Sequence, residues 1–399
     1  MYKSNIERNV YMNFIDKVKA IEGKIIENRR YLHKNPELSG QEFETQKYIM
    51  KQLDELNIPY EKVGTTSLVG YIKGANSGKT VGLRADIDAL PIIEQSGAPY
   101  SSLKEGVMHA CGHDGHTAML LGAAKLLKEV QDELSGNVKL IFQEAEETFT
   151  GAQKVIKDGG MDGVDAVFGM HGMPIETGSY DLAPGYRMAG CDTIYVKFEG
   201  VSGHGSLPHK SKDTILPAAE FVTQLNAMIT KFVDAQSPLV LTVGKFDAGT
   251  KANIISKYAK LDISMRYLHE ETRKTIHRKI RSLAEGLALI YDIKIDVEIE
   301  ESTISMNNDE KIAEIADKSA EKVFGLGKNV HGPIMMGSED MPYYFQKAPG
   351  AYALVGYANK EKDTEYFPHH EKFNIDEDYL KFGAALHAQF AWDYLGSNC

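Results

Sequence analysis

Cysteine is scarce in this sequence, which has only three cysteines among its 399 residues. Three cysteines cannot build a framework of disulfide bonds, so the composition favours a reducing compartment, and we expect a cytoplasmic protein. The N-terminal residues 1–9 are polar and of mixed charge, and they lack the apolar core of a signal peptide. No stretch approaches about 18 uninterrupted apolar residues, so the sequence predicts no membrane-spanning helix.

An excess of basic residues is also missing, because 56 acidic side chains outnumber 45 basic ones and give a formal net charge of -11. Nucleic acids and anionic membranes bind basic faces, so we expect neither as a main partner. The hydrophobic share of 43% and the charged share of 25% are those of an ordinary globular protein. Because a single hydrophobic core serves at most roughly 250–300 residues, we expect two domains.

The densest group of potential metal ligands lies in residues 108–117, which read MHACGHDGHT. This stretch holds one cysteine, three histidines and one aspartate, and its two glycines leave the backbone free to fold around a common point. Cys111 and His113 are both good ligands for a borderline-soft divalent metal. The apolar run 118–124 follows and predicts a buried helix. A turn with a structural cysteine and solvated histidines is the alternative, but it leaves this density of ligand types unexplained.

Ionisable side chains directly follow several short apolar runs that we expect to be strands. The strands and the side chains that follow them are 80–83 with Asp86, 138–142 with Glu146 and Glu147, 166–170 with His171, and 351–356 with His369. In α/β sheets, sites form at the carboxyl ends of the strands, so these side chains can meet. Apolar residues at helical spacing predict helices near 13–34, 41–56, 117–134, 151–158 and 376–395. Alternation of strands and helices predicts an α/β domain with a mostly parallel sheet and helices on both faces.

The middle of the chain changes character. From about 190 to 300 the expected order is strand, helix, two strands, helix, strand, which is that of a ferredoxin-like α+β unit. This unit lies between two stretches of α/β pattern, so we interpret it as an inserted lid. The sequence therefore predicts a discontinuous metal-binding catalytic domain, residues 1–187 and 303–399, and a lid domain, residues 188–302.

The candidate ligands can hold more than one metal ion. A single structural ion takes about four ligands, whereas five ligands with one of them shared can hold two ions about 3.5–4 Å apart. Mixed sulfur, nitrogen and oxygen donors suit zinc, manganese, cobalt or nickel better than magnesium or calcium. Such a pair of ions is suited to hydrolysis, because water bound to it becomes a nucleophile near neutral pH. The candidate ligands are Cys111, His113, Glu147, His171 and His369.

These motifs resemble those of the metal-dependent aminoacylase and carboxypeptidase family. The closest resemblance is to its amidohydrolase subgroup, with hippurate hydrolases, auxin-conjugate hydrolases and N-acetyl-diaminopimelate deacetylases. The resemblance covers nearly the whole chain. The matching segments are 83–91, 109–118, the pair Glu146–Glu147, 170–172, 203–209, 337–341, and His369 four residues before Phe373.

The resemblance implies a role for each residue of the catalytic domain. Cys111 would bridge two divalent metal ions in each subunit. Glu146 would be the general base and later the proton donor to the leaving amine. Asp86 would orient His113 through a hydrogen bond. The terminal ligands would be His113, Glu147, His171 and His369.

The resemblance also implies roles for the lid. His204 would stabilise the oxyanion of the reaction, and Asn253 would contact the substrate. Arg266 lies where it could pair with a substrate carboxylate. The lid would in addition form the interface of a homodimer.

Three segments depart from the family pattern, and none of them removes a ligand. Glu144 stands where the family usually has proline, and Phe149-Thr150-Gly151 replaces a pair of glycines. His370 follows His369 directly and competes with it as a ligand, with only the spacing to Phe373 favouring His369. The acidic run 144–147 would on its own be typical of a solvated turn.

The sequence as a whole predicts a metal-dependent amidohydrolase. It would hydrolyse the amide bond of N-acyl amino acids or similar small N-acyl conjugates and give a carboxylic acid and a free amino acid. A metallo-carboxypeptidase or dipeptidase that acts on small peptides is the alternative, since water attack on an amide is the same chemistry. A metal-stabilised binding protein without activity is disfavoured, because Glu146 and all five candidate ligands are present.

Overall fold

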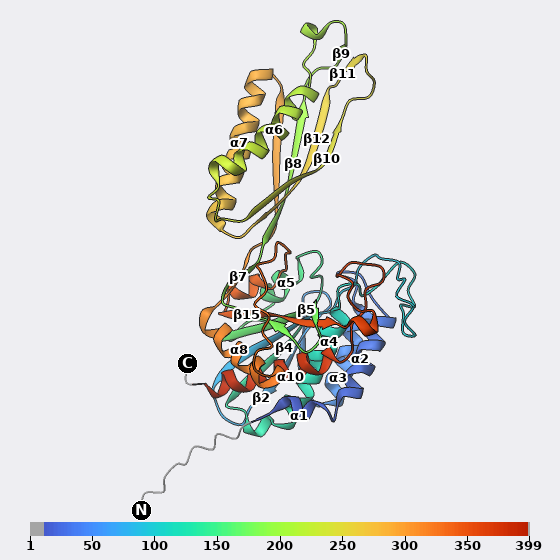
Figure 1. Ribbon diagram of the computed structural model, residues 1–399, viewed down its shortest axis with the longest axis vertical. Coiled ribbons are helices and arrows are strands. Elements are labelled where there is room, and N and C mark those ends of the chain that lie inside the picture. The colour runs from blue at the N-terminus through green and yellow to red at the C-terminus, as the bar shows by residue number, and fades with distance from the viewer. Residues whose placement is uncertain (1–11, 398–399) are drawn as a thin grey trace, which may run out of the picture. The chain divides into compact units, whose positions relative to one another are not determined.

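The computed structural model describes residues 12–397, which form two units, each with its own hydrophobic core. The first unit comprises the chain up to Gly185, Asn307–Pro333 and the chain from Tyr343 onward (Figure 1). The second comprises Tyr186–Met306 and Ile334–Pro342. Cys399 and the polar start of the chain lie outside the described residues. Within residues 12–397 no helix combines the length and the apolar composition needed to cross a membrane.

A seven-stranded mixed sheet in the order β1-β2-β4-β3-β5-β15-β6 forms the centre of the first unit. The four central strands β4, β3, β5 and β15 pair parallel with one another. The outer pairings, β1 with β2, β2 with β4 and β15 with β6, are antiparallel. This confirms the predicted α/β class. The strands are β1 (Tyr60–Val63), β2 (Ser67–Lys73), β3 (Lys79–Asp86), β4 (Gly136–Gln143), β5 (Ala166–Glu176), β6 (Tyr180–Asp181) and β15 (Gly350–Ala358).

Helix α4 is the central helix of the first unit, and it packs against α2 and α10. The approach to α10 is close, because a Cβ added at Gly383 would meet the sulfur of Met119 at 1.8 Å. Tight packing of this kind fixes the position of α4, whose first residue is His113. The helices are α1 (Phe14–Val18), α2 (Glu22–Lys34), α3 (Phe43–Glu55), α4 (His113–Glu129), α5 (Gly151–Lys157), α8 (Glu310–Phe324), α9 (Pro342–Phe345) and α10 (Tyr379–Gly396).

Several element boundaries differ from the sequence prediction. The helix expected over 13–34 is two helices, because a turn with hydrogen bonds from residue i to i−3 interrupts it at Ala20 and Ile21. Helix α4 begins at His113 instead of 117, because Gly112 adopts a left-handed conformation (φ 86°) and starts the helix there. Strand β5 continues through His171 to Glu176, because it pairs with β15 along this length. Helix α8 was not predicted.

The second unit contains a four-stranded antiparallel sheet in the order β10-β12-β8-β13, covered by two helices. With strands numbered along the chain, this is the order 2-3-1-4 of a ferredoxin-like unit. Its elements are β8 (Gly190–Glu199), α6 (Ile215–Phe232), β10 (Leu239–Ala248), β12 (Tyr258–Tyr267), α7 (Glu270–Tyr291) and β13 (Lys294–Thr303). Short strands β9 (Gly203–His204) and β11 (Ile254–Ile255) pair with each other.

The limits of this unit are close to the expected residues 188 and 302, but one segment is added. Residues Ile334–Pro342, which the sequence places in the catalytic domain, belong to the second unit. Backbone hydrogen bonds hold this segment, since Met335 donates to Arg187 and Ala189 donates to Gly337.

Candidate metal centre

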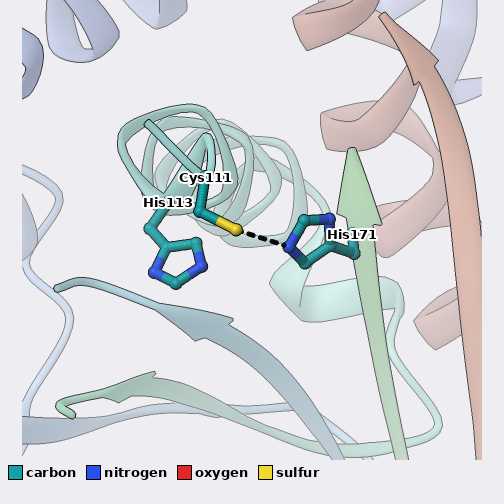
Figure 2. A group of neighbouring side chains, drawn as sticks. All are labelled: Cys111, His113 and His171. Atoms are coloured by element: carbon teal, nitrogen blue, oxygen red, sulfur yellow. Dashed lines mark hydrogen bonds between the residues drawn. The ribbon is translucent and has the colours of Figure 1, made fainter. Parts of the chain in front are cut away.

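Cys111, His113 and His171 converge at the N-terminal end of α4 and beside strand β5 (Figure 2). Sγ of Cys111 lies 3.3 Å from Nε2 of His171. Sγ and one ring nitrogen from each histidine all lie within 4.8 Å of one another. The left-handed Gly112 separates the cysteine from His113, and in Figure 2 the sulfur of Cys111 points toward His171 on β5. The three residues can therefore contact a common cation.

A second group joins Cys111 to Glu147 and His369, again with ligand atoms within 4.8 Å of one another. Nε2 of His369 lies 3.4 Å from Oε1 of Glu147. The backbone places His369 here, because its N–H donates to the carbonyl of Ala110 at 2.7 Å and its φ of 71° is left-handed. Cys111 is common to both groups, which is the position that a bridging ligand requires.

Glu146 lies beside these groups. Nε2 of His113 is 3.8 Å from a carboxylate oxygen of Glu146 and 4.0 Å from one of Glu147. This buried nitrogen has no hydrogen-bond partner. A buried polar atom without a partner is costly, and a cation shared with the carboxylates would satisfy it. The donor set thus fits a divalent metal.

The electrostatics of the centre also favour a cation. Burial raises the pKa of the Cys111 thiol well above its ordinary value, and the carboxylates of Glu147 and Glu146 raise it further. Burial alone would lower the pKa of His113, but Asp86 and Asp88 outweigh it and raise this pKa to about 10. The negative charges of the buried carboxylates therefore outnumber the positive charges around this thiol. A bound metal would supply that charge and would hold the sulfur as a thiolate.

The partner of His113 differs from the sequence prediction. Asp86 was predicted to orient His113, but its carboxylate lies 3.8 Å from Nδ1, too far for a hydrogen bond. Asp88 makes this contact at 3.1 Å, and its second oxygen accepts the N–H of Glu147 at 3.1 Å. Sequence reasoning missed Asp88, although alternation along a strand puts residues 86 and 88 on the same side.

Asp86 supports a different candidate ligand, His171, and it does so through His116. Nδ1 of His116 donates to Asp86 at 2.6 Å, and Nε2 accepts the N–H of Gly172 at 2.9 Å. Both nitrogens of His116 are thus used in hydrogen bonds. Nδ1 of His171 donates to the carbonyl of Gly172 at 2.6 Å, which leaves Nε2 of His171 for the metal. Metal-binding histidines usually have such a partner for the second nitrogen.

Geometry separates the two neighbouring histidines near the C-terminus. Of the two, His369 belongs to a group of potential ligands among the described residues, and His370 does not. The ring of His370 stacks on Tyr366 with centroids 4.7 Å apart, and its Nδ1 accepts the N–H of Lys372 at 3.0 Å.

The three predicted substrate contacts lie in the second unit. His204 is exposed on β9, and its Nδ1 lies 2.8 Å from the hydroxyl of Ser206. The carbonyl of Asn253 accepts the N–H of Gly205 at 2.9 Å, so these two predicted residues are neighbours. Arg266 on β12 donates to Ser338 at 2.8 Å and to the carbonyl of Met336 at 3.2 Å. These three residues therefore belong to the second unit, whereas all five candidate ligands belong to the first.

An α/β fold that carries sulfur, nitrogen and oxygen donors around a buried glutamate defines a metal-dependent hydrolase. Comparison with known proteins agrees. Residues 82–393 match the profile of the family described as peptidase family M20/M25/M40, and the chain belongs to this family. The resemblance drawn from the sequence is thereby confirmed.

Several named relatives align along almost the whole chain. N-acetyl-L-cysteine deacetylase of Bacillus subtilis is 39% identical over 90% of this chain and 85% of its own length. Thermostable carboxypeptidase 2 of Saccharolobus solfataricus is also 39% identical, over 94% of this chain and 96% of its own. Hippurate hydrolase of Campylobacter jejuni is 38% identical over 96% of this chain and 100% of its own. Both amidohydrolases and a carboxypeptidase are thus similar to this chain.

Solved structures share the fold. A protein from methicillin-resistant Staphylococcus aureus that is described as an aminohydrolase superposes with a TM-score of 0.91 at 37% identity, over 96% of this chain and 100% of that one. A Bacillus subtilis protein described as a dinuclear metal-binding peptidase of the M20 family has a TM-score of 0.83 at 34% identity, over 94% and 99% of the two chains.

Proposed function

We propose that the protein is a dinuclear metal-dependent amidohydrolase that cleaves N-acyl amino acids or similar small N-acyl conjugates. The products would be a carboxylic acid and a free amino acid. The observation that carries this proposal is the sharing of Cys111 between two groups of ligand atoms, with Glu146 beside them. Relatives named as a deacetylase and a hippurate hydrolase support the substrate class.

Five side chains would hold the two ions. Cys111 would bridge them, and the imidazoles and one carboxylate would complete the set. Zinc, manganese, cobalt or nickel suits this mixture of donors. When bound, the ions polarise the scissile carbonyl and lower the pKa of water. The terminal ligands would be His113, Glu147, His171 and His369.

Glu146 would be the general base. Its side chain is buried beside His113 and Glu147. A water molecule bound between the ligands would lie within its reach. It would accept a proton as the water attacks the amide carbon, and it would then deliver this proton to the departing nitrogen. This protonation lets the nitrogen leave as a neutral amine. The carboxylic acid formed in the same step ionises to a carboxylate, which the amine does not attack, so the amide bond does not reform.

Three residues of the second unit would act on the substrate. His204 would donate a hydrogen bond to the oxyanion, Asn253 would contact the substrate, and Arg266 would pair with its carboxylate. We also propose that this unit forms the interface of a homodimer. A cytoplasmic location fits the small number of cysteines, of which Cys111 and Cys191 are free.

The alternative function is that of a carboxypeptidase or dipeptidase. Support for it comes from the relative named thermostable carboxypeptidase 2, which is as similar in sequence as the deacetylase. The two functions differ only in the group on the acyl side of the amide, since the metal centre and the base would be the same.

Release of free amine from a substrate panel separates these functions. The panel pairs N-acetyl and N-benzoyl amino acids with unblocked dipeptides of the same C-terminal residue, each with the protein reconstituted with one of the four metals. We expect kcat/KM for the best N-acyl compound to exceed that for its dipeptide by about tenfold or more. The opposite ratio would establish the peptidase, and no hydrolysis of either class would refute the proposal.

A further inference from the structure

Glu146 and Glu147 lie in a turn, residues 144–151, whose backbone is strained. Ala145 has a φ of 51° and Phe149 a φ of 54°, although neither is glycine. Space is also tight, because a Cβ added at Gly151 would lie 1.6 Å from the carbonyl oxygen of Glu144. Non-glycine residues persist in the left-handed region only where their surroundings hold them there. Contacts with neighbouring segments must therefore hold this turn in its conformation.

Glu42 holds the strained residue directly. This glutamate precedes helix α3 and is fully buried. One oxygen of its carboxylate accepts the N–H of Ala145 at 2.9 Å and that of Gly40 at 2.8 Å. The other oxygen accepts the hydroxyl of Thr66 at 2.5 Å. Both oxygens are thus used in hydrogen bonds within the first unit.

Glu144 holds the beginning of the same turn. Its fully buried carboxylate accepts backbone N–H groups from Thr65 at 2.7 Å, from Thr66, and from Ser67 at 3.0 Å. Lys154 donates to its other oxygen at 2.7 Å. The side chain is therefore committed to the turn between β1 and β2. The solvated turn that would be typical of this acidic run on its own is therefore not formed by Glu144, whose side chain is buried.

Thr66 connects the two carboxylates, because its hydroxyl also lies 3.2 Å from the carboxylate of Glu144. Glu42, Thr66 and Glu144 thus form one buried network, which we call the carboxylate brace. It joins the start of α3, the β1–β2 turn and the turn that carries Glu146 and Glu147. On the far side of that pair, Asp88 holds the N–H of Glu147.

We propose that the carboxylate brace positions Glu146 and Glu147 for proton transfer and metal binding. The two glutamates are fixed from both ends, by Ala145 through Glu42 and by the N–H of Glu147 through Asp88. A fully satisfied buried network is rigid, so it can keep a strained turn in one conformation without a metal. This proposal rests on the function proposed above. It makes Glu42 and Glu144 positioning residues, since neither carboxylate belongs to a group of ligand atoms among the described residues.

The variants Glu144→Gln and Glu42→Gln test this role. Glutamine keeps the shape of the side chain but turns an NH₂ group toward backbone donors, which loosens the turn. We expect metal affinity, measured by calorimetric titration of manganese into chelator-stripped protein, to fall about tenfold or more. We expect kcat to fall by a similar factor while KM stays within about twofold, because the proposed substrate contacts His204, Asn253 and Arg266 are not part of the brace.

Asp317→Asn is the matched control. Asp317 accepts hydrogen bonds from Tyr180 and Asn329 in the same unit and contacts no residue of the brace. Its loss should reduce stability but leave metal affinity and kcat unchanged. If the two brace variants behave like this control, the brace only stabilises the fold and the proposal is overturned.

Thr66→Val is a milder variant for the case in which the glutamine variants do not fold. It removes only the shared hydroxyl, and the same measurements apply with a smaller loss. Amide hydrogen exchange over residues 145–151 in metal-free protein provides a readout that is independent of the proposed function. We expect exchange to be about tenfold faster in the variants, relative to Asp317→Asn. Unchanged exchange would overturn the brace even if the proposed function is right. Wild-type protein without metal binding or activity would refute the proposed function, whereas faster exchange in the variants would still show that the brace holds the turn.

Discussion

Asp88 holds two candidate metal ligands with one carboxylate. Oδ1 lies 3.1 Å from Nδ1 of His113, and Oδ2 accepts the N–H of Glu147 at 3.1 Å. The hydroxyl of Ser39 donates to the same carboxylate at 2.7 Å. The distance between an imidazole from α4 and a carboxylate from the turn after β4 is thus set by a residue just after β3.

Asp88→Asn should weaken metal binding about 10–100-fold, because the amide must turn its NH₂ group toward one of the two donors. Calorimetric titration with manganese or zinc measures the change. Ser39→Ala, which removes only the third hydrogen bond, is the control and should have a much smaller effect. Equal affinity in Asp88→Asn and wild type would show that the carboxylate does not orient the ligands.

Glu146→Gln should lower kcat by about 10²–10⁴-fold while two metal ions per chain remain bound. The amide cannot accept the proton of the attacking water, but it leaves the five candidate ligands in place. Metal content by elemental analysis and steady-state rates on the same sample give both quantities. Substantial activity in this variant would rule out Glu146 as the base.

His369→Ala and His370→Ala form a matched pair of neighbouring substitutions. Loss of His369 should remove one metal ion per chain and nearly all activity, because its Nε2 is directed at Glu147. Loss of His370 should change neither, since its ring stacks on Tyr366. The reverse pattern in metal content would assign the ligand to His370.

Removal of the metal should affect the two units unequally. Ligands bound only to the folded state stabilise it, by about 2.7 kcal/mol at a concentration 100 times the dissociation constant. After treatment with a chelator, hydrogen exchange should speed up in peptides of α4 and β5, whereas peptides of β12 and α7 should keep their protection. Uniform loss of protection, or none, would contradict a metal centre confined to the first unit.

Glu94 should make the stability depend on pH under acidic conditions. Burial alone would raise its pKa, but hydrogen bonding to His33 and the charge of His33 lower it from 4.5 to about 2. Unfolded chains therefore bind this proton more tightly than the folded protein does. The stabilisation is complete above about pH 4.5 and is lost as the pH falls toward 2.

Denaturant midpoints at about pH 7 and pH 3 measure this effect. Glu94→Gln should be less stable than wild type at the higher pH, and the difference should shrink at the lower pH. Glu361→Gln, at an exposed position, is the control and should show no such trend. A constant difference between Glu94→Gln and wild type would contradict the assignment.

The candidate metal ligands could be predicted from the sequence, whereas the residues that hydrogen-bond to them could not. Cys111, His113 and His171 could be predicted to meet, because each lies near a strand end or in a loop of unusual ligand density. Which carboxylate reaches His113 could not be predicted, because Asp86 and Asp88 share one side of the chain and differ only by tertiary distances of 3.8 and 3.1 Å.

The sequence also could not predict that the side chain of Glu144 is buried. A glutamate in an acidic run usually lies in water, but here three backbone amides from a turn 77 to 79 positions earlier in the chain receive it. Contacts between segments this far apart have no local signal. The strands and helices of the ferredoxin-like sheet in the second unit, in contrast, depend on local periodicity, and there the expected elements match the structure.

The parallel pairing of β5 with β15 has a consequence for biosynthesis. Gly350 pairs with Val167, so the ribosome must complete the whole second unit before β5 acquires this neighbour. Until then the edge of β5 is open to pairing with other chains, a recognised cause of aggregation. His369 emerges later still. A nascent or truncated chain that ends before β15 therefore has four of the five candidate ligands and cannot become a finished enzyme, however well its second unit has folded.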